Sequence, residues 1–190
     1  MEAVNKEAMQ MFSALLALGA LAGSAVLAAA VFLRPGRAEG FLHEVSEAAR
    51  EHAVRLSLLL AGTAMLGSLY FSEVVHYSPC KLCWYQRICM YSIAIVSLVA
   101  TVRRERRQIA PYVLVLSLVG LTVSVYHYLV EWFPQIETNV CTVDVPCTTI
   151  WFRELGFLTL PSMAGIAFIG CALLMINVLR DPSETLIPAA

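Results

Sequence analysis

The sequence predicts an all-α membrane protein, and two observations carry that prediction. Hydrophobic residues make up 59% of the 190-residue chain and charged residues only 14%, and the mean hydropathy is +0.72. Soluble domains are less apolar than this. Five segments are also nearly free of charge and approach the roughly 20 residues that span a bilayer. The net charge of −1 gives no sign of a nucleic-acid partner.

The five apolar segments cover residues 11–33, 56–72, 88–102, 109–130 and 157–179. We interpret each as a transmembrane helix, the third with an amphipathic lead-in before residue 88. Prolines lie at or near the ends of these segments, where residues that interrupt a helix belong. They are Pro35, Pro79, Pro111, Pro134 and Pro182.

The basic residues predict the orientation in the membrane, because cytoplasmic loops are rich in lysine and arginine. Nine of the thirteen Lys and Arg residues fall on one side: Arg34, Arg37, Arg50, Arg55, Arg103, Arg104, Arg106, Arg107 and Arg180. The other four are Lys6, Lys81, Arg87 and Arg153. We therefore expect the N-terminus to lie outside the cell and the C-terminus inside.

The first 55 residues are predicted to form an N-terminal transmembrane anchor and an amphipathic interfacial segment. Residues 1–10 are not basic, unlike the start of a secretory signal, which favours an uncleaved anchor. In residues 38–55, the residues expected on one apolar face recur at helical spacing: Phe41, Leu42, Val45, Ala48, Ala49 and His52. This pattern is typical of an amphipathic helix on the cytoplasmic surface, although a solvated linker helix remains an alternative.

The predicted topology sorts the six cysteines. Cys80 and Cys83 fall in the outer loop between the second and third helices, and Cys141 and Cys147 in the next outer loop. The remaining two, Cys89 and Cys171, lie within apolar spans, where a lone cysteine usually behaves as a small hydrophobic residue. Two close pairs that face an oxidising compartment indicate disulfide chemistry.

Three kinds of site compete for these four cysteines. A four-thiolate zinc site commonly uses two C-x2-C pairs, whereas the second pair here is C-x5-C with a proline inside it. Two permanent structural disulfides are also possible. The two-residue spacing of Cys80 and Cys83 is instead typical of redox enzymes. Spacing and compartment together favour a redox site.

The first pair is placed to be reactive. Pro79 can start a helix, so that Cys80 and Cys83 lie at a helix N-terminus, whose partial positive charge stabilises a thiolate. Arg87 lies on the same helix face, four residues beyond Cys83. At 1.5 Å per residue it is about 6 Å deeper in the membrane than Cys83. An arginine at that depth is either a functional group or a snorkelling anchor.

A second polar group supports the functional interpretation of Arg87. His127 lies close to the outer end of the fourth helix, so that the two side chains can share one depth on neighbouring helices. Together they can donate hydrogen bonds to a polar head group within the membrane, such as a quinone carbonyl, and Gln86 can add a donor. A histidine merely hydrogen-bonded to a neighbour is the alternative. The aromatic residues around the second outer loop are expected in the interfacial belt.

Several stretches together resemble the disulfide bond formation protein B (DsbB) family, in its BdbC-like branch. They are "YFSEVVHYSPCKLCWYQRICMY" (70–91), "VYHYLVE" (125–131), the C-x5-C loop and "GFLTLPSMAGIAF" (156–168). The resemblance implies a four-helix transmembrane bundle over residues 56–180 with two extracytoplasmic redox loops. The extra N-terminal transmembrane helix and amphipathic segment would precede the bundle, and residues 181–190 would form a short cytoplasmic tail.

The resemblance also implies a function. The protein would be a protein-disulfide:quinone oxidoreductase in the bacterial cytoplasmic membrane, which reoxidises a DsbA-like thioredoxin-fold protein and passes electrons to ubiquinone or menaquinone. The partner would attack Cys141, Cys147 would exchange with Cys80, and Cys83 would reduce the quinone. Arg87 would hold the quinone head group with help from His127.

The chain departs from the family pattern in two ways, and two other functions are alternatives to the one implied. The first helix is extra to the family's usual four, and the short C-x5-C loop leaves the step from Cys147 to Cys80 the least secure. A quinone reductase of the vitamin K epoxide reductase type also couples cysteine pairs to quinones, although "CWYQR" argues against it. A non-enzymatic membrane scaffold clamped by a four-cysteine zinc site is the other alternative.

Overall fold

The computed structural model describes residues 2–33, 40–138, 140–141 and 145–180. Within these ranges the chain forms six α-helices and no strand. They are α1 (Glu2–Phe32), α2 (Phe41–Glu51), α3 (Ala53–Leu69), α4 (Lys81–Arg103), α5 (Ala110–Trp132) and α6 (Leu160–Leu179), joined by a π-helical turn η1 (Tyr70–Val74) and a 3-10 turn η2 (Pro134–Ile136). The predicted tail, 181–190, and the basic residues Arg34 and Arg37 lie outside the described residues.

All the long helices are apolar enough to cross a membrane, which confirms the predicted all-α membrane fold. The spans cover Lys6–Phe32, Ala53–Val74, Lys81–Arg103, Ala110–Trp132 and Leu160–Leu179. The third begins at Lys81 rather than residue 88, so the expected lead-in is part of the same helix. The last begins at Leu160, because the chain before it makes a tight loop closed by an isolated bridge between Glu154 and Leu158.

Local sequence explains where the helices begin and end. Cys80 is the N-cap of α4, and its sulfur accepts the backbone N–H of Cys83. Arg104 ends the same helix in the left-handed conformation, at φ 59°. Proline occupies the first turn of both α5 and α6, where no backbone donor is needed.

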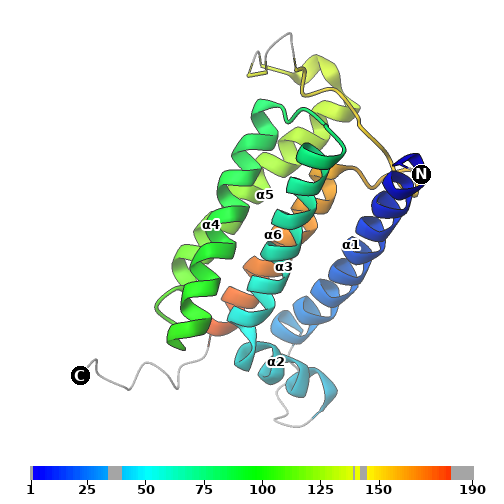
Figure 1. Cartoon of the computed structure of the whole chain (residues 1–190). Helices are drawn as coiled ribbons and strands as arrows, with labels where there is room; N and C mark the ends of the chain where they lie inside the picture. The colour runs from blue at the N-terminus through cyan, green and yellow to red at the C-terminus, as the bar shows by residue number, and fades with distance from the viewer. Residues whose placement is uncertain (1, 34–39, 139, 142–144, 181–190) are drawn as a thin grey trace.

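Helix α6 lies at the centre of the molecule and packs against α5, α3 and α1 (Figure 1). Two close helix contacts depend on glycine. A side chain at Gly120 of α5 would collide with the buried ring of Phe168, and one at Gly170 of α6 would come within 2.8 Å of Leu60. Small residues therefore bring the helices together, as in other membrane bundles.

The two ends of the bundle differ in what they carry. One end, which we call the cysteine end, holds the start of α1, the loop before α4 and the loop between α5 and α6 (Figure 1). The opposite end holds α2, the loop between α4 and α5, and the end of α6. The predicted grouping of loops is therefore present in the fold.

Helix α1 is attached to the bundle at both ends. At the cysteine end, the Gln10 amide Nε2 donates to the Tyr77 hydroxyl at 2.8 Å, and both residues are buried. At the opposite end, Arg180 donates to the carbonyl oxygen of Val31 at 2.7 Å and its guanidinium lies 4.5 Å from the centroid of the Phe32 ring. The helix is thus fixed to the bundle near both of its ends.

Helix α2 packs against the bundle at Ser46, with Ala49 next to the main core. Phe41 and Ala48, which were expected on the apolar face, are exposed, whereas Ser46 is fully buried. The Ser46 hydroxyl donates to Asn177 Oδ1 at 2.9 Å, and Asn177 Nδ2 donates to the Ser46 carbonyl at 2.7 Å. A reciprocal pair of hydrogen bonds to α6 therefore fixes the face of α2, which an apolar pattern alone does not reveal.

Candidate functional site

The first cysteine pair lies at the start of α4, as its sequence context predicts. The Sγ atoms of Cys80 and Cys83 are 2.9 Å apart, and both are free thiols. The Cys83 backbone N–H points at the Cys80 sulfur at 3.3 Å. The cap geometry therefore aims a backbone donor and a helix N-terminus at Cys80, and both favour a negative charge there.

The second pair is joined in a disulfide between Cys141 and Cys147. Their Cα atoms are 5.8 Å apart, within the usual range for a disulfide. Cys147 is buried, with 1% of its surface exposed, whereas Cys141 is only partly buried. The sulfur of Cys141 is therefore the one that a soluble partner reaches more readily.

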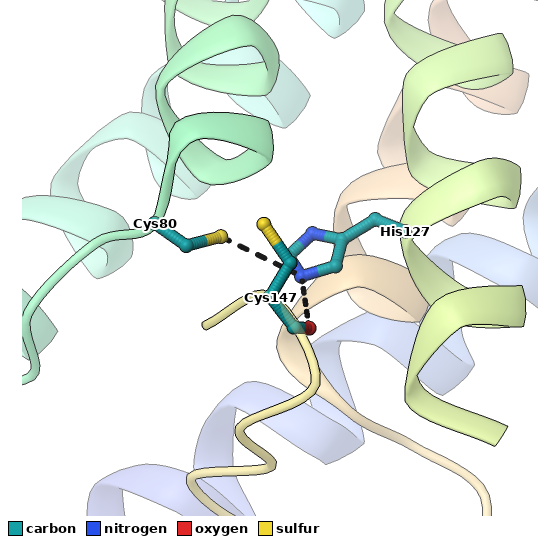
Figure 2. Close-up of side chains that lie close together, drawn as sticks. All are labelled: Cys80, His127 and Cys147. Carbon is teal, nitrogen blue, oxygen red and sulfur yellow. Dashed lines mark hydrogen bonds between the residues drawn. The ribbon is translucent and has the colours of Figure 1, made fainter. Parts of the chain in front are cut away.

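His127 brings the two pairs together (Figure 2). Its Nε2 lies 3.7 Å from the Cys80 sulfur and 3.2 Å from the carbonyl oxygen of Cys147. Because a carbonyl oxygen can only accept, Nε2 carries the hydrogen. The ligand atoms of Cys80, His127 and Cys147 all lie within 4.8 Å of one another. The C-x5-C loop therefore reaches Cys80 despite its short length.

These contacts change the acidity of Cys80. The hydrogen bond from Cys83 lowers the pKa of the Cys80 thiol most strongly, and the hydrogen bond and charge of His127 lower it further. Burial acts in the opposite direction, and the result is a pKa of about 4, against 9.0 for an ordinary cysteine. Cys80 is therefore a thiolate at neutral pH, and a good leaving group in thiol exchange.

Two cavities meet at Cys83. The small cavity, of about 10 Å³, is lined by Cys80, Cys83, His127 and Glu131 among others, and has room for about one water molecule. The large cavity, of about 840 Å³, is also lined by Cys83. Of the four cysteines in the two pairs, only Cys83 lines the large cavity, so it connects the thiol-exchange site with that space.

The polar end of the large cavity is formed by Cys83, Gln86 and Arg87. Ser68 of α3 holds Arg87, which donates from Nε to the hydroxyl at 2.9 Å and from Nη2 to the carbonyl at 2.9 Å. The Arg87 guanidinium also lies 5.2 Å from the centroid of the Trp84 ring. Gln86 donates its amide to Ser124 at 3.1 Å, so this donor points to α5.

The structure separates one group that the sequence analysis placed together. Gln86 and Arg87 line the large cavity with Cys83, whereas His127 lines the small one and contacts Cys80 and Cys147. Cys89 and Cys171 are buried outside both cavities, among the apolar residues of the main core.

Sequence reasoning missed two residues of this site. Ser68, which holds Arg87, lies in an apolar span and has no distinguishing neighbour in the sequence. Trp151 was expected in an aromatic belt; its ring stacks on that of Tyr77, with the centroids 4.5 Å apart, and it lines both cavities.

The cavities differ in what they can hold. Cys80, His127 and Cys147 are close enough to bind one metal ion, but the Cys147 sulfur is in a disulfide and is not a thiolate ligand. The large cavity suits a flat ring with a carbonyl oxygen, because it offers a fixed arginine donor beside a thiol and aromatic faces, with apolar walls beyond. The donor set of the large cavity therefore fits a quinone.

Comparison with known proteins identifies the family of the chain. The sequence model of the family "Disulfide bond formation protein DsbB" matches residues 50–178. The chain is 39% identical over 133 residues to a probable disulfide formation protein of Oceanobacillus iheyensis, covering 69% of this chain and 91% of that protein. It is 40% identical over 129 residues to disulfide bond formation protein C of Bacillus subtilis, covering 67% and 93% of the two chains.

A third relative is the SPbeta prophage-derived disulfide bond formation protein B of Bacillus subtilis. It is 38% identical over 114 residues, which cover 60% of this chain and 76% of that protein. No solved structure matches the chain. Helix α1 lies outside the residues matched by the family model. The match extends over most of the chain and includes both cysteine pairs, and the chain therefore belongs to the DsbB family of disulfide bond formation proteins.

Proposed function

We propose that this membrane thiol–disulfide oxidoreductase reoxidises a DsbA-like thioredoxin-fold protein outside the cytoplasm and passes the electrons to a membrane quinone. One observation carries the proposal. Cys80 lies beside Cys147 on one side, while its neighbour Cys83 lines the large cavity on the other. The two cysteine pairs thus form a continuous path from a loop to a space bounded by membrane-spanning helices.

The first steps transfer the disulfide to the partner. A partner thiolate attacks Cys141, the more accessible sulfur, and the Cys141–Cys147 bond breaks to release Cys147 as a thiolate. The second partner thiol then attacks the mixed disulfide, so that the partner leaves oxidised and Cys141 is released. Two electrons and two protons have then passed from the partner to this cysteine pair.

The next steps re-form the Cys141–Cys147 disulfide and reduce the Cys80–Cys83 disulfide. Cys147 attacks Cys80 of an oxidised Cys80–Cys83 pair, releasing Cys83, and Cys141 then attacks Cys147 to release Cys80. The low pKa of Cys80 favours this last step, because a more acidic thiol leaves faster. The product has a Cys141–Cys147 disulfide and free thiols at Cys80 and Cys83, which is the arrangement present here.

The large cavity supplies the electron acceptor in this proposal. A bound ubiquinone or menaquinone takes up the two electrons and two protons that Cys80 and Cys83 lose when they form a disulfide. Arg87 would bind the head group beside Cys83, with Gln86 as a further polar neighbour. His127 would act on the thiol side, where its Nε2–H stabilises the Cys80 thiolate.

The proposed orientation places the cysteine end in the periplasm or exterior of a bacterial cytoplasmic membrane. Among the described residues, the elements of the opposite end carry most of the basic side chains, which include Arg50 in α2, Arg55 in the first turn of α3, Arg103 at the end of α4, Arg106 in the loop that follows, and Arg180 after α6. Cytoplasmic loops have that bias. The relatives named above are bacterial proteins.

The decisive test is quinone reduction by the purified protein supplied with a reduced thioredoxin-fold donor. We expect turnover in the wild type and none in Cys83→Ser or Cys141→Ser. Cys89→Ser is the control, since this cysteine lies outside both cavities. Turnover that survives loss of Cys83 would contradict the proposed path, and one tightly held zinc ion per chain with no turnover would favour the scaffold alternative.

A further inference from the structure

We infer that α1 forms one wall of a binding site for the isoprenoid tail of the quinone, a role that rests on the proposed function. The large cavity is not confined to the residues around Cys83. It continues along α1, which contributes lining residues from Met9 to Ala20. At 1.5 Å per residue, this stretch of helix is about 16 Å long. The cavity is therefore long enough for more than a head group.

The cavity lies between α1 and α3, with α6 behind it. The main contacts of α1 are with α6 and α2, and α3 packs instead against α4 and α6. Figure 1 shows α1 set apart from α3, with α6 partly hidden behind α3. The lining residues come from the facing sides of these helices, including Leu16 of α1, Leu59 of α3 and Met163 of α6.

The lining changes character along its length. Its polar end holds Cys83, Gln86 and Arg87, and Arg87 is the only charged residue among the described residues that line the cavity. Beyond them the walls are mainly leucine, alanine, methionine and aromatic side chains. A ligand that matches this division has one small polar head and a long uncharged tail. An isoprenoid quinone has that form, and its tail must leave the head-group site by a connected space.

The wall is held in place rather than loosely associated. The Gln10–Tyr77 hydrogen bond fixes α1 next to the polar end, and Lys6 lies 4.9 Å from the centroid of the same Tyr77 ring. The contacts of Arg180 with Val31 and Phe32 fix its far end. Because α1 lies outside the residues that match the family, this wall is an addition to the shared bundle.

Two glycines of α1 provide a matched test. Gly19 lines the cavity, and a side chain built there meets nothing within 4 Å, so Gly19→Phe would project into open space. Gly23 lies one turn further along, is also exposed and free of neighbours, and does not line the cavity. Gly23→Phe therefore controls for the same change on the same helix.

The experiment measures the binding of two quinones with the same ring, one without a tail and one with several isoprene units. Binding to the full-length protein is followed by quenching of tryptophan fluorescence, and turnover is measured in parallel. In Gly19→Phe the phenyl ring takes volume that the tail would fill, so the tail loses apolar contacts with the wall. We expect binding of the tailed quinone to weaken by about fivefold to tenfold. Binding of the tailless quinone and the behaviour of Gly23→Phe should match the wild type.

A second variant keeps the test valid if Gly19→Phe does not fold. Leu16→Ala removes an exposed apolar wall residue without adding volume, and we expect it to weaken tailed-quinone binding by about threefold while sparing the tailless one. Equal affinities of the wild type and both variants for the tailed quinone would overturn the role of α1, as would equal losses for both quinones. If the wild type binds and reduces neither quinone, the proposed function itself fails, which is a distinct result.

Discussion

The sulfur atoms of Cys80 and Cys147 lie within 4.8 Å of each other, although they belong to different loops. This proximity predicts that the two form a disulfide when their usual partners are removed. In Cys83→Ser/Cys141→Ser, mild oxidation should join Cys80 to Cys147 nearly completely, as measured by peptide mass spectrometry without reduction. The proposed relay needs this bond as its intermediate.

The matched control for this oxidation experiment is Cys80→Ser/Cys141→Ser, which leaves Cys83 and Cys147. Cys83 faces the large cavity and is not part of the group formed by Cys80, His127 and Cys147. We therefore expect its disulfide with Cys147 to form more slowly. Equal rates in the two double variants, or free thiols in both, would contradict the assigned pairing.

The acidity of Cys80 leads to a prediction about pH. Its pKa of about 4 makes it a thiolate above that pH, so its alkylation by iodoacetamide should be nearly constant from about pH 5 to 8 and fall below about pH 4. The measurement uses Cys83→Ser, whose hydroxyl keeps a hydrogen-bond donor next to Cys80. Burial of Cys80 slows the reaction but does not move the midpoint of its pH profile.

Removing His127 should shift that profile toward higher pH. His127→Ala eliminates a hydrogen bond and a favourable charge, both of which lower the pKa of Cys80. The apparent pKa should rise. A rise of one unit, about 1.4 kcal/mol, lowers the thiolate fraction at pH 5 from about 90% to about 50%, so alkylation at that pH should decrease about twofold. An unchanged midpoint in His127→Ala would show that His127 does not control the thiolate.

The two hydrogen bonds between Arg87 and Ser68 predict a positioning role for Ser68. Ser68→Ala removes the hydroxyl but keeps the carbonyl acceptor, so the guanidinium should lose orientation without losing its charge. We expect KM for the quinone to rise about threefold to tenfold, in line with roughly 1 kcal/mol for one hydrogen bond. The value of kcat and the exchange between cysteine pairs should change little.

Two further variants serve as comparisons for Ser68→Ala, one with a larger expected effect and one with none. Arg87→Ala should raise KM further, because it removes the donor itself, while leaving exchange between the cysteine pairs intact. Thr122→Ala removes an exposed hydroxyl of α5 that contacts only its own helix and should match the wild type. A KM for Ser68→Ala equal to that of the wild type would indicate that Arg87 needs no help from α3.

The sequence predicted the helices and the first cysteine pair well, because both depend on local properties. Apolar run length determines a membrane span, and Pro79 followed by Cys80 is a local start signal for α4. The grouping of Arg87 with His127 was inferred from depth alone. Depth does not specify which side of α4 a neighbouring helix occupies, and α5 places His127 on the side of Cys80 and Cys147.

Contacts between distant segments could not be read from local patterns. The packing face of α2 depends on a hydrogen-bonded pair, Ser46 and Asn177, that lies far apart in the chain. The attachment of α1 to the loop before α4 likewise depends on Gln10 and Tyr77, which lie 67 residues apart in the chain. Polar pairs inside an apolar bundle decide such details, because each buried donor needs an acceptor.

The buried contact between Gln10 and Tyr77 predicts a change in stability. Tyr77→Phe keeps the ring that stacks on Trp151 but removes the hydroxyl, so the Gln10 amide loses its acceptor. We expect the free energy of unfolding to fall by about 1–3 kcal/mol, the usual cost of an unsatisfied buried donor. Thermal unfolding of the full chain in detergent measures this, with Tyr85→Phe, an exposed tyrosine, as the control.

A double variant separates the hydrogen bond from other effects of losing the hydroxyl. In Gln10→Leu/Tyr77→Phe neither polar group remains, so most of the lost stability should return. If the double variant is less stable than Tyr77→Phe alone, the Gln10 side chain contributes by packing rather than through this bond. If Tyr77→Phe is as stable as the wild type, the contact does not hold α1 to the bundle, and the wall of the large cavity must be fixed by α6 alone.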